Sequence, residues 1–289
     1  MQVISTKNIL NCGGRLVKTD KPLVMGILNI TQDSFFDGGK HLSIDSALAQ
    51  TEKMLIEGAT FIDVGAQSTR PGADMIGEEA ELKAAIPVIE AIVKHFPDAL
   101  ISIDTFRAKV ADEAIQASAV IINDVSAGDD DSEMFRTVIN HKVPYIMMHK
   151  QGNSKTMQHK PTYNDVLLDI INYFIPKVEY LKANGVADII IDPGFGFGKS
   201  MEHNYDLLNR LDRFKIFELP ILVGMSRKKM IQHVTKTDAN GALNGTTAAN
   251  TIALMKGANI LRVHDVKEAV ETVNVYIEMM NFEWVIVKD

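Results

Sequence analysis

The sequence has one cysteine, no cluster of basic residues and no long apolar run. The single cysteine, Cys12, leaves no partner for an internal disulfide and excludes a zinc site built from cysteines. No apolar run approaches the roughly 20 residues that span a bilayer, and the N-terminus has no apolar signal core. We therefore expect a soluble, cytoplasmic protein.

Basic charge is also scarce relative to acidic charge. Lys and Arg total 30 and Asp and Glu total 37, which gives a formal net charge of −7. An acidic chain without a basic cluster is a poor partner for nucleic acid or an anionic membrane, so we expect neither as a main partner. The length of 289 residues, 46% of them hydrophobic, suits one large α/β barrel or two smaller domains.

The sequence does contain a repeated alternation of short apolar strands and amphipathic helices. The expected strands are 23–28, 61–64, 100–103, 120–122, 145–148, 189–191, 221–224 and 260–263. Strands that alternate with helices pair in parallel through helical crossovers. About eight such units in roughly 250 residues match an α/β fold of the (β/α)8 TIM-barrel type. An open doubly wound sheet is the alternative.

A short β-hairpin is expected before the barrel. Asn11-Cys12-Gly13-Gly14 stands between two apolar runs, which is a typical hairpin sequence. We expect this hairpin, at about residues 3–18, to cover one end of a barrel at about 22–280. Because no shift in composition divides the chain, residues 1–289 are predicted to form a single domain.

The stretch 189–199, Ile-Ile-Ile-Asp-Pro-Gly-Phe-Gly-Phe-Gly-Lys, joins a buried strand to a glycine-rich loop. Asp192 ends the strand, and Pro193 cannot continue the ladder because it has no N–H group. The alternating glycines let the backbone turn sharply and approach a ligand closely. Taken alone, the stretch is equally consistent with a plain turn in which Asp192 caps the next helix.

Polar side chains recur at the ends of the expected strands. The strand-end residues are Asn29, Asp63, Asp104, Asn123, Met148 with His149, Asp192, Gly224 with Lys228, and Arg262 with His264. In a barrel these ends meet at one rim, where the βα loops build the active site. Any one of them is weak evidence, since Asp and Asn are common in turns. A rim where nearly every strand ends in a polar side chain indicates a site.

The chemistry of this set favours a flat heterocycle beside a phosphate group. Asp104, Asn123 and Asp192 supply acceptors and an amide, and Lys228 supplies a donor, which suits a ring with alternating donors and acceptors such as a pterin. The cationic or potentially cationic side chains that suit a phosphate group are Arg70, Arg262 and His264.

Two further residues extend this interpretation. Asn29 offers a hard oxygen ligand that could hold Mg²⁺ on a phosphate. Ser226 is expected to begin a helix, whose N-terminal amides could bind an anion such as a carboxylate.

The chain resembles the dihydropteroate synthase family over almost its whole length. The matching segments are 25–31, 33–35, 68–72, 192–199, 226–228 and 262–265. This family condenses 6-hydroxymethyl-7,8-dihydropterin pyrophosphate with p-aminobenzoate, releases pyrophosphate and forms 7,8-dihydropteroate for folate synthesis. It is the sulfonamide target and is usually a homodimer, formed through helices on the outside of the barrel. The resemblance implies the same activity here, with Mg²⁺ as cofactor and a dissociative mechanism.

The resemblance also implies a residue set for each ligand. The implied pterin residues are Asp63, Asp104, Asn123, Met148, Asp192, Gly224 and Lys228. The implied pyrophosphate residues are Asn29, Arg70, Arg262 and His264, with Asn29 as the Mg²⁺ ligand. The implied p-aminobenzoate residues are Phe35, Thr69, Pro71, Phe197 and Ser226. The implied catalytic residues are Asp33, Arg70, Lys228, Arg262 and His264. Asp33 and Arg70 lie on the first two βα loops, which are mobile in this family and order over the site.

Some positions depart from the family pattern, and some alternatives stay open. Gln32, Phe36 and Gln67 stand where the family usually has other residues, and Lys199 belongs to the motif without a role that we can assign. A pterin-dependent methyltransferase and a non-catalytic pterin-binding homologue are the alternatives within the resemblance. From the residues alone, an aldolase that forms a Schiff base at Lys228 is a further alternative.

Overall fold

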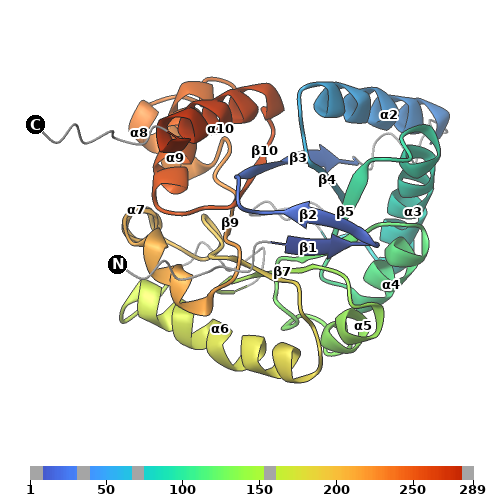
Figure 1. The fold of residues 1–289 in the computed structure, drawn as a ribbon, viewed down its shortest axis with the longest axis horizontal. Helices are drawn as coiled ribbons and strands as arrows, with labels where there is room; N and C mark the ends of the chain where they lie inside the picture. Colours follow the sequence, from blue (N-terminus) through green and yellow to red (C-terminus); the bar gives the residue numbers. More distant parts are fainter. Residues whose placement is uncertain (1–8, 31–39, 67–74, 153–160, 282–289) are drawn as a thin grey trace, which may run out of the picture.

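The computed structural model describes residues 9–30, 40–66, 75–152 and 161–281. Within these residues the central element is an eight-stranded parallel sheet that forms a barrel (Figure 1). Its strands are β3 (Leu23–Asn29), β4 (Phe61–Gly65), β5 (Leu100–Asp104), β6 (Ile121–Asp124), β7 (Tyr145–Met148), β8 (Ile189–Asp192), β9 (Leu222–Val223) and β10 (Ile260–Val263). The expected TIM barrel is confirmed.

The order of pairing shows how the barrel closes. The strands lie in the order β8-β7-β6-β5-β4-β3-β10-β9, so seven pairings are continuous ladders. A parallel bridge between Ile191 and Ile221 joins the two ends of this series. Closure leaves no open edge, which distinguishes a barrel from the doubly wound alternative.

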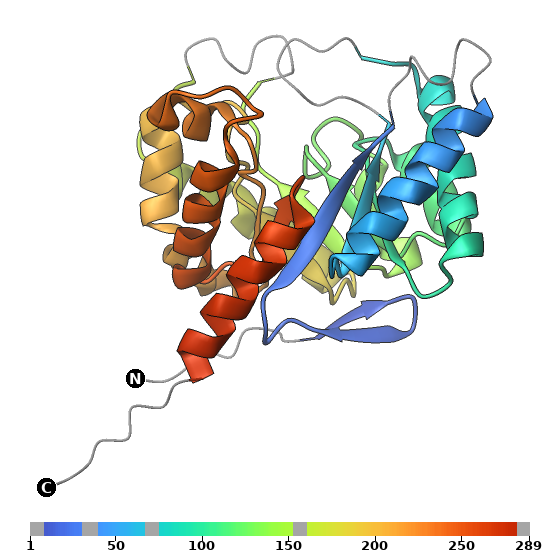
Figure 2. The ribbon, with the colours of Figure 1, turned by 90° about the horizontal axis from the view of Figure 1, so that it is seen from above.

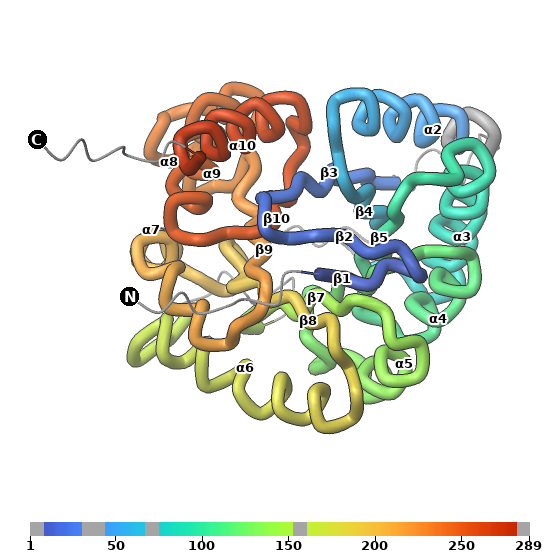
Figure 3. The backbone as a smooth tube through the Cα atoms, viewed as in Figure 1, coloured from blue at the N-terminus to red at the C-terminus, as the bar shows by residue number. Residues whose placement is uncertain are grey.

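Helices surround the strands (Figure 3). They are α2 (Lys40–Ile56), α3 (Glu78–His95), α4 (Ala108–Gln116), α5 (Met134–His141), α6 (Val166–Ala183), α7 (Met201–Asn209), the 3-10 helix η1 (Leu211–Phe217), α8 (Lys229–Thr235), α9 (Leu243–Met255) and α10 (Val266–Asn281). Each crossover helix covers the outer face of the barrel with its apolar stripe. Among the described helices, none combines the length and apolar character that crossing a membrane would require.

The expected N-terminal hairpin is present as β1 (Ile9–Cys12) and β2 (Arg15–Lys18), which pair antiparallel. Gly13 and Gly14 form the turn with φ of 61° and 87°, the left-handed region that two-residue hairpin turns need. Figure 2 shows the hairpin lying across the end of the barrel from which β3 starts.

The hairpin completes a separate core inside the barrel. Leu10 and Cys12 are fully buried and belong to one apolar cluster with inward-facing strand residues such as Phe61 and Ile190. A larger apolar cluster lies between the strands and the helices. The amino-terminal end of the barrel is therefore closed by packed side chains, and the carboxyl ends of the strands are left for a site.

Some helix starts differ from the sequence-based prediction. The sequence favours Ser43 as the N-cap of the first helix, because serine is a good N-cap residue, but α2 begins at Lys40, so this prediction is wrong. The cap of α7 was not predicted: Ser200 accepts a hydrogen bond from the His203 N–H, and the His203 side chain accepts from the Ser200 N–H. Asp165 caps α6 by accepting from two backbone N–H groups of its first turn.

Candidate active site

The polar residues at the carboxyl ends of neighbouring strands lie level with one another. The parallel register pairs Asp104 of β5 with Asn123 of β6, and Met148 of β7 with Asp192 of β8. The side chains that the sequence places at strand ends therefore meet at one rim of the barrel, as expected.

Arg262 links three strands across this rim. It lies on β10, and its Nε donates to Asp63 Oδ2 of β4 at 2.6 Å while its Nη2 donates to Asp104 Oδ2 of β5 at 2.6 Å. Asn123 Nδ2 of β6 donates to the same Asp63 oxygen at 3.0 Å. The second oxygens, Asp63 Oδ1 and Asp104 Oδ1, are buried without a hydrogen-bond partner in the described part of the chain. Buried acceptors of this kind are rare and suit the donors of a ligand.

Burial controls the charge of this group. It raises the pKa of Asp104 to about 7, against the opposing effect of the Arg262 cation, and the neighbouring Asp63 carboxylate adds to the rise. For Arg262, burial lowers the pKa, but the carboxylates of Asp63 and Asp104 more than offset this and hold it above its ordinary value. The guanidinium therefore stays charged, and Asp104 is able to change protonation state near neutral pH.

A second set of charged groups lies where β8 and β9 end. Lys228 Nζ donates to the Phe195 carbonyl oxygen and sits 4.5 Å from the centroid of the Phe197 ring. Burial lowers the pKa of Lys228 to about 8, although the Asp192 carboxylate opposes the change. Burial likewise raises the pKa of Asp192, and Lys228 opposes it. A half-buried lysine beside a buried carboxylate offers a paired donor and acceptor to a polar ring.

The glycine-rich loop after β8 packs against the end of β7. Gly194 has φ of 74°, and a Cβ there would lie 1.9 Å from the His149 carbonyl oxygen. Gly198 has φ of 65°, and a Cβ there would lie 2.2 Å from the Gln151 carbonyl oxygen. Only glycine fits both the backbone conformation and the close approach, so the loop is pressed onto the neighbouring strand end.

Ser226 has a different structural role from the one expected. The helix after β9 begins at Lys229, with Lys228 at its N-cap position, so the prediction that Ser226 caps this helix was wrong. Instead, Ser226 Oγ accepts a hydrogen bond from the His264 N–H at 3.2 Å. Arg227 forms an ion pair with Asp265 at 2.5 Å. These two contacts join the loop after β9 to the loop after β10.

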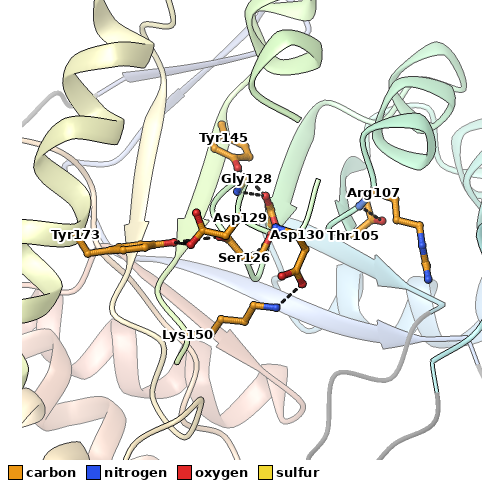
Figure 4. A network of polar contacts seen from close by, with 10 residues as sticks. Thr105, Arg107, Ser126, Gly128, Asp129, Asp130, Tyr145, Lys150 and Tyr173 are labelled. Atoms are coloured by element: carbon orange, nitrogen blue, oxygen red, sulfur yellow. Dashed lines mark hydrogen bonds and ion pairs between the residues drawn. The ribbon is translucent and has the colours of Figure 1, made fainter. Parts of the chain in front are cut away.

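A buried network that the sequence did not reveal supports the end of β6 (Figure 4). Asp124, next to Asn123, accepts hydrogen bonds from the Ser126 N–H, the Ser126 hydroxyl, the Gly128 N–H and the Tyr145 hydroxyl, each at 2.7 Å. Burial raises the pKa of Asp124, and these hydrogen bonds oppose the rise. The only sequence signal was an aspartate two residues before a serine, a common turn pattern.

Some of the remaining predicted site residues lie within the described part of the chain, and others do not. Asn29 is exposed at the carboxyl end of β3, Met148 is buried at the end of β7, and Gly224 follows β9 beside Arg262. Asp33, Phe35, Thr69, Arg70 and Pro71, together with Gln32, Phe36 and Gln67, lie outside the described residues.

Comparison with known proteins identifies the class first. The family model described as "Pterin binding enzyme" matches residues 25–264, which include every strand of the barrel except the first two residues of β3. The barrel and the rim of buried carboxylates therefore belong to a pterin-binding enzyme.

Individual relatives are more specific. The chain is 45% identical over 264 residues to the dihydropteroate synthase of Escherichia coli K12, covering 91% of this chain and 93% of that protein. It is 39% identical over 282 residues to the dihydropteroate synthase of Bacillus subtilis, covering 97% and 94%. The chain belongs to the dihydropteroate synthase family, which confirms the resemblance found in the sequence.

Solved structures agree with this assignment. The Yersinia pestis dihydropteroate synthase in a sulfonamide drug complex has a TM-score of 0.87 and 42% identity, covering 94% of this chain and 98% of that one. The Xanthomonas albilineans dihydropteroate synthase with 4-aminobenzoic acid has a TM-score of 0.88 and 37% identity, covering 96% and 100%.

Proposed function

We propose that this chain condenses 6-hydroxymethyl-7,8-dihydropterin pyrophosphate with p-aminobenzoate to give 7,8-dihydropteroate and pyrophosphate. The observation that carries the proposal is the rim where Arg262 joins Asp63 and Asp104, and where one buried oxygen of each has no partner within the described part of the chain. Relatives that match over most of this chain are named dihydropteroate synthase. One similar structure, from Xanthomonas albilineans, is described in complex with 7,8-dihydropteroate.

The pterin ring is proposed to bind against the buried polar groups. A pterin carries N–H and amino donors on one edge, which suit the unpaired oxygens of Asp63 and Asp104 and the carboxylate of Asp192. Its ring nitrogens and carbonyl accept hydrogen bonds, which suits Asn123 and Lys228. A competing ring that lacks one of these groups would leave a buried protein group unsatisfied, at a cost of about 1–3 kcal/mol.

The pyrophosphate is proposed to bind at the same rim, near Arg262 and His264, with Arg70 added from the second βα loop. Arg262 is held by two carboxylates, so it reaches a phosphate only by sharing its remaining N–H groups or by releasing one carboxylate. If Arg262 moved from Asp104 to the phosphate, the Asp104 carboxylate would lose its cationic partner. Binding of the leaving group would then affect the charge of Asp104 in the pterin site.

The fit of Mg²⁺ rests on Asn29. Among the described residues, no group of three or more His, Cys, Asp or Glu side chains is arranged to hold a metal ion. Mg²⁺ on a phosphate needs few protein ligands, and the exposed amide of Asn29 at the end of β3 is a suitable oxygen donor. When bound there, Mg²⁺ would neutralise negative charge on the pyrophosphate.

The proposed mechanism is dissociative. Arg262 and His264 stabilise the negative charge that grows on the departing pyrophosphate. The electron-rich pterin, held by Asp104, Asn123 and Asp192, stabilises the positive charge left on its methylene carbon. The amine of p-aminobenzoate then attacks that carbon and loses a proton. Because an aryl amine is weakly basic and therefore unprotonated at neutral pH, the step needs no strong general base.

A homodimer is proposed through α9 and α10. Exposed apolar side chains on these two packed helices are Ile252, Met255, Val275, Met279 and Met280. The two helices pack against each other, and large exposed apolar side chains on neighbouring helices are candidates for an interaction surface. Val275→Lys should therefore shift the mass measured by light scattering towards the monomer, whereas the matched change Ile56→Lys, on α2, should leave it unaltered. An unchanged mass in Val275→Lys would exclude this surface as the dimer interface.

The activity is tested by supplying both substrates with Mg²⁺ and following dihydropteroate and pyrophosphate by chromatography. Equal amounts of the two products, abolished by a chelator and restored by Mg²⁺, are the expected result. Pterin binding without product would favour a non-catalytic homologue instead. Absence of pterin binding would overturn the proposal.

A further inference from the structure

Lys199 is a buried lysine with three acceptors within hydrogen-bond distance of its ammonium group. It is 3% exposed, and Nζ lies 3.0 Å from His149 Nδ1, 3.2 Å from the His149 carbonyl oxygen and 3.1 Å from the Phe197 carbonyl oxygen. An ammonium group has three N–H donors, so each has an acceptor. All three acceptors are uncharged, which is unusual for a buried cation.

The partners of Lys199 belong to two strand ends. His149 follows β7, and Phe197 lies in the loop after β8, so the lysine fastens this loop to the neighbouring strand. His149 accepts at Nδ1. Burial lowers the pKa of its imidazole to about 2, and the positive charge of Lys199 adds a smaller effect in the same direction. The imidazole is therefore neutral and remains an acceptor throughout the physiological pH range.

Two lysines hold alternate carbonyl groups of the same loop. Lys228 donates to the Phe195 carbonyl oxygen, and Lys199 donates to the Phe197 carbonyl oxygen. Lys228 Nζ also lies 4.5 Å from the centroid of the Phe197 ring. The position of this ring relative to Lys228 thus depends on where Lys199 holds the Phe197 backbone.

Other contacts hold the loop on both sides of Phe197. The Phe197 N–H donates to the Gly194 carbonyl oxygen at 3.2 Å, and Lys199 supplies the hydrogen bond to the Phe197 carbonyl oxygen. Tyr163 OH donates to the Gly198 carbonyl oxygen at 2.8 Å, and the Gly196 N–H donates to Asn204 Oδ1 at 2.7 Å. Burial lowers the pKa of Lys199 well below its ordinary value, and the Asp192 carboxylate opposes this. Retaining a lysine at such a cost is consistent with a demand for geometry that an apolar residue would not meet.

We propose that Lys199 is a positioning residue that sets the place of the Phe197 ring beside Lys228 and thereby controls binding of p-aminobenzoate more than binding of the pterin. The proposal rests on the proposed function and on the residue sets that the family resemblance implies, in which Phe197 borders the p-aminobenzoate pocket and Lys228 contacts the pterin. Asp192 begins the loop and accepts a hydrogen bond from the Gly194 N–H at 2.7 Å, so the pterin side has a hydrogen bond that does not involve Lys199.

The test is the variant Lys199→Met, which keeps the length of the side chain and removes the ammonium group. Initial rates are measured with p-aminobenzoate varied at saturating pterin pyrophosphate, and then with the two roles exchanged. Loss of the hydrogen bonds of a buried amino group should raise the KM for p-aminobenzoate about tenfold or more. The KM for the pterin substrate should change by less than about threefold. Inhibition by sulfanilamide, an aryl amine similar in shape to p-aminobenzoate, should weaken in parallel.

A matched control separates positioning from general stability. Lys177 also donates to a loop carbonyl, that of Ala127 at 2.8 Å, but it fastens the loop after β6. Lys177→Met should lower the unfolding temperature without raising the KM for p-aminobenzoate. If Lys199→Met raised both KM values equally, or behaved like Lys177→Met, the positioning role would be excluded.

A second variant keeps the proposal testable if Lys199→Met fails to fold. Lys199→Gln retains two N–H donors and should show a smaller rise in the KM for p-aminobenzoate. In a chain that already carries Phe197→Leu, Lys199→Gln should raise the KM for p-aminobenzoate by less than about twofold. The effects of two residues that act through one another are not additive. Full additivity would overturn the proposal. Absence of turnover in the wild-type chain would instead overturn the proposed function, so the two failures are distinguishable.

Discussion

Arg262 and Asp104 form an ion pair across the rim of the barrel, with Nη2 2.6 Å from Oδ2, and the other oxygen of Asp104 is buried without a partner among the described residues. The carboxylate is thus half satisfied by the protein. A buried acceptor in this state gains a full hydrogen bond when a ligand donor arrives, so the pair is prepared for a ligand and not optimised for the empty protein.

Asp104→Asn should make stability less sensitive to pH. Burial raises the pKa of Asp104 to about 7 in the folded protein, against about 3.9 in an unfolded chain. A raised folded pKa contributes stability that is complete below about pH 4 and is lost as pH rises through about 7. The unfolding temperature of Asp104→Asn minus that of the wild type should therefore increase between about pH 5 and 8. Asp98→Asn, at an exposed position, is the control, and a flat difference for Asp104→Asn would contradict the assignment.

Arg262→Met should lower both turnover and stability. Removing the cation leaves the carboxylates of Asp63 and Asp104 buried together without their partner, which costs about 3–5 kcal/mol of unfolding free energy. Turnover should fall by about a hundredfold or more because the developing charge on the leaving group loses a donor. Urea unfolding and steady-state kinetics measure the two effects. Arg262→Lys keeps the charge and should recover part of the stability, and a fully stable, fully active Arg262→Met would exclude both roles.

Gly194→Ala should abolish pterin binding. A Cβ at Gly194 would lie 1.9 Å from the His149 carbonyl oxygen, so the loop that follows Asp192 has to move. Gly185→Ala is a matched control because Gly185 has φ of 83°, similar to the 74° of Gly194, and nothing lies within 4 Å of its added Cβ. Both variants should lose about 1 kcal/mol to backbone strain, and only Gly194→Ala should lose affinity for a pterin in calorimetric titration. Equal affinities in the two variants would show that the close approach is not required.

Tyr145→Phe should lower the free energy of unfolding by about 1–3 kcal/mol, because Asp124 loses one of its buried donors. Turnover should change little, since the other three donors to Asp124 remain. Tyr180→Phe removes a hydroxyl from an exposed tyrosine on α6 and serves as the control. Chemical denaturation measures the difference, and equal stabilities of the two variants would argue against an energetic role for the network.

Much of the fold was predictable because the barrel strands and several helices are marked by local sequence. The strand 145–148 was predicted with the bounds that the structure shows, since a continuous apolar run separates it from polar loops. The 3-10 helix η1 was not predicted. Its buried residues, Leu211, Phe214 and Phe217, recur at every third position. In so short a segment this spacing does not distinguish a 3-10 helix from an α-helix or a loop.

The sequence also predicted which residues lie at the site. It did not predict which of these residues contact one another. Parallel register brings strand-end residues such as Asp104 and Asn123 together whatever their side chains are. The choice of partners depends on packing between distant segments: Arg262 and Asp63 are 199 positions apart, and Lys199 and His149 are 50 apart. Local sequence carries no signal for such contacts.

The closed end of the barrel makes the chain suitable for labelling chemistry. Cys12 is the only cysteine and is fully buried under the hairpin, where burial raises the pKa of its thiol to about 12. A thiol reacts as its thiolate, so native Cys12 is protected by both burial and protonation. A fluorophore or spin label attached to a cysteine introduced elsewhere would therefore report from that position without background. Slow alkylation of Cys12 itself would measure how often the hairpin leaves the barrel.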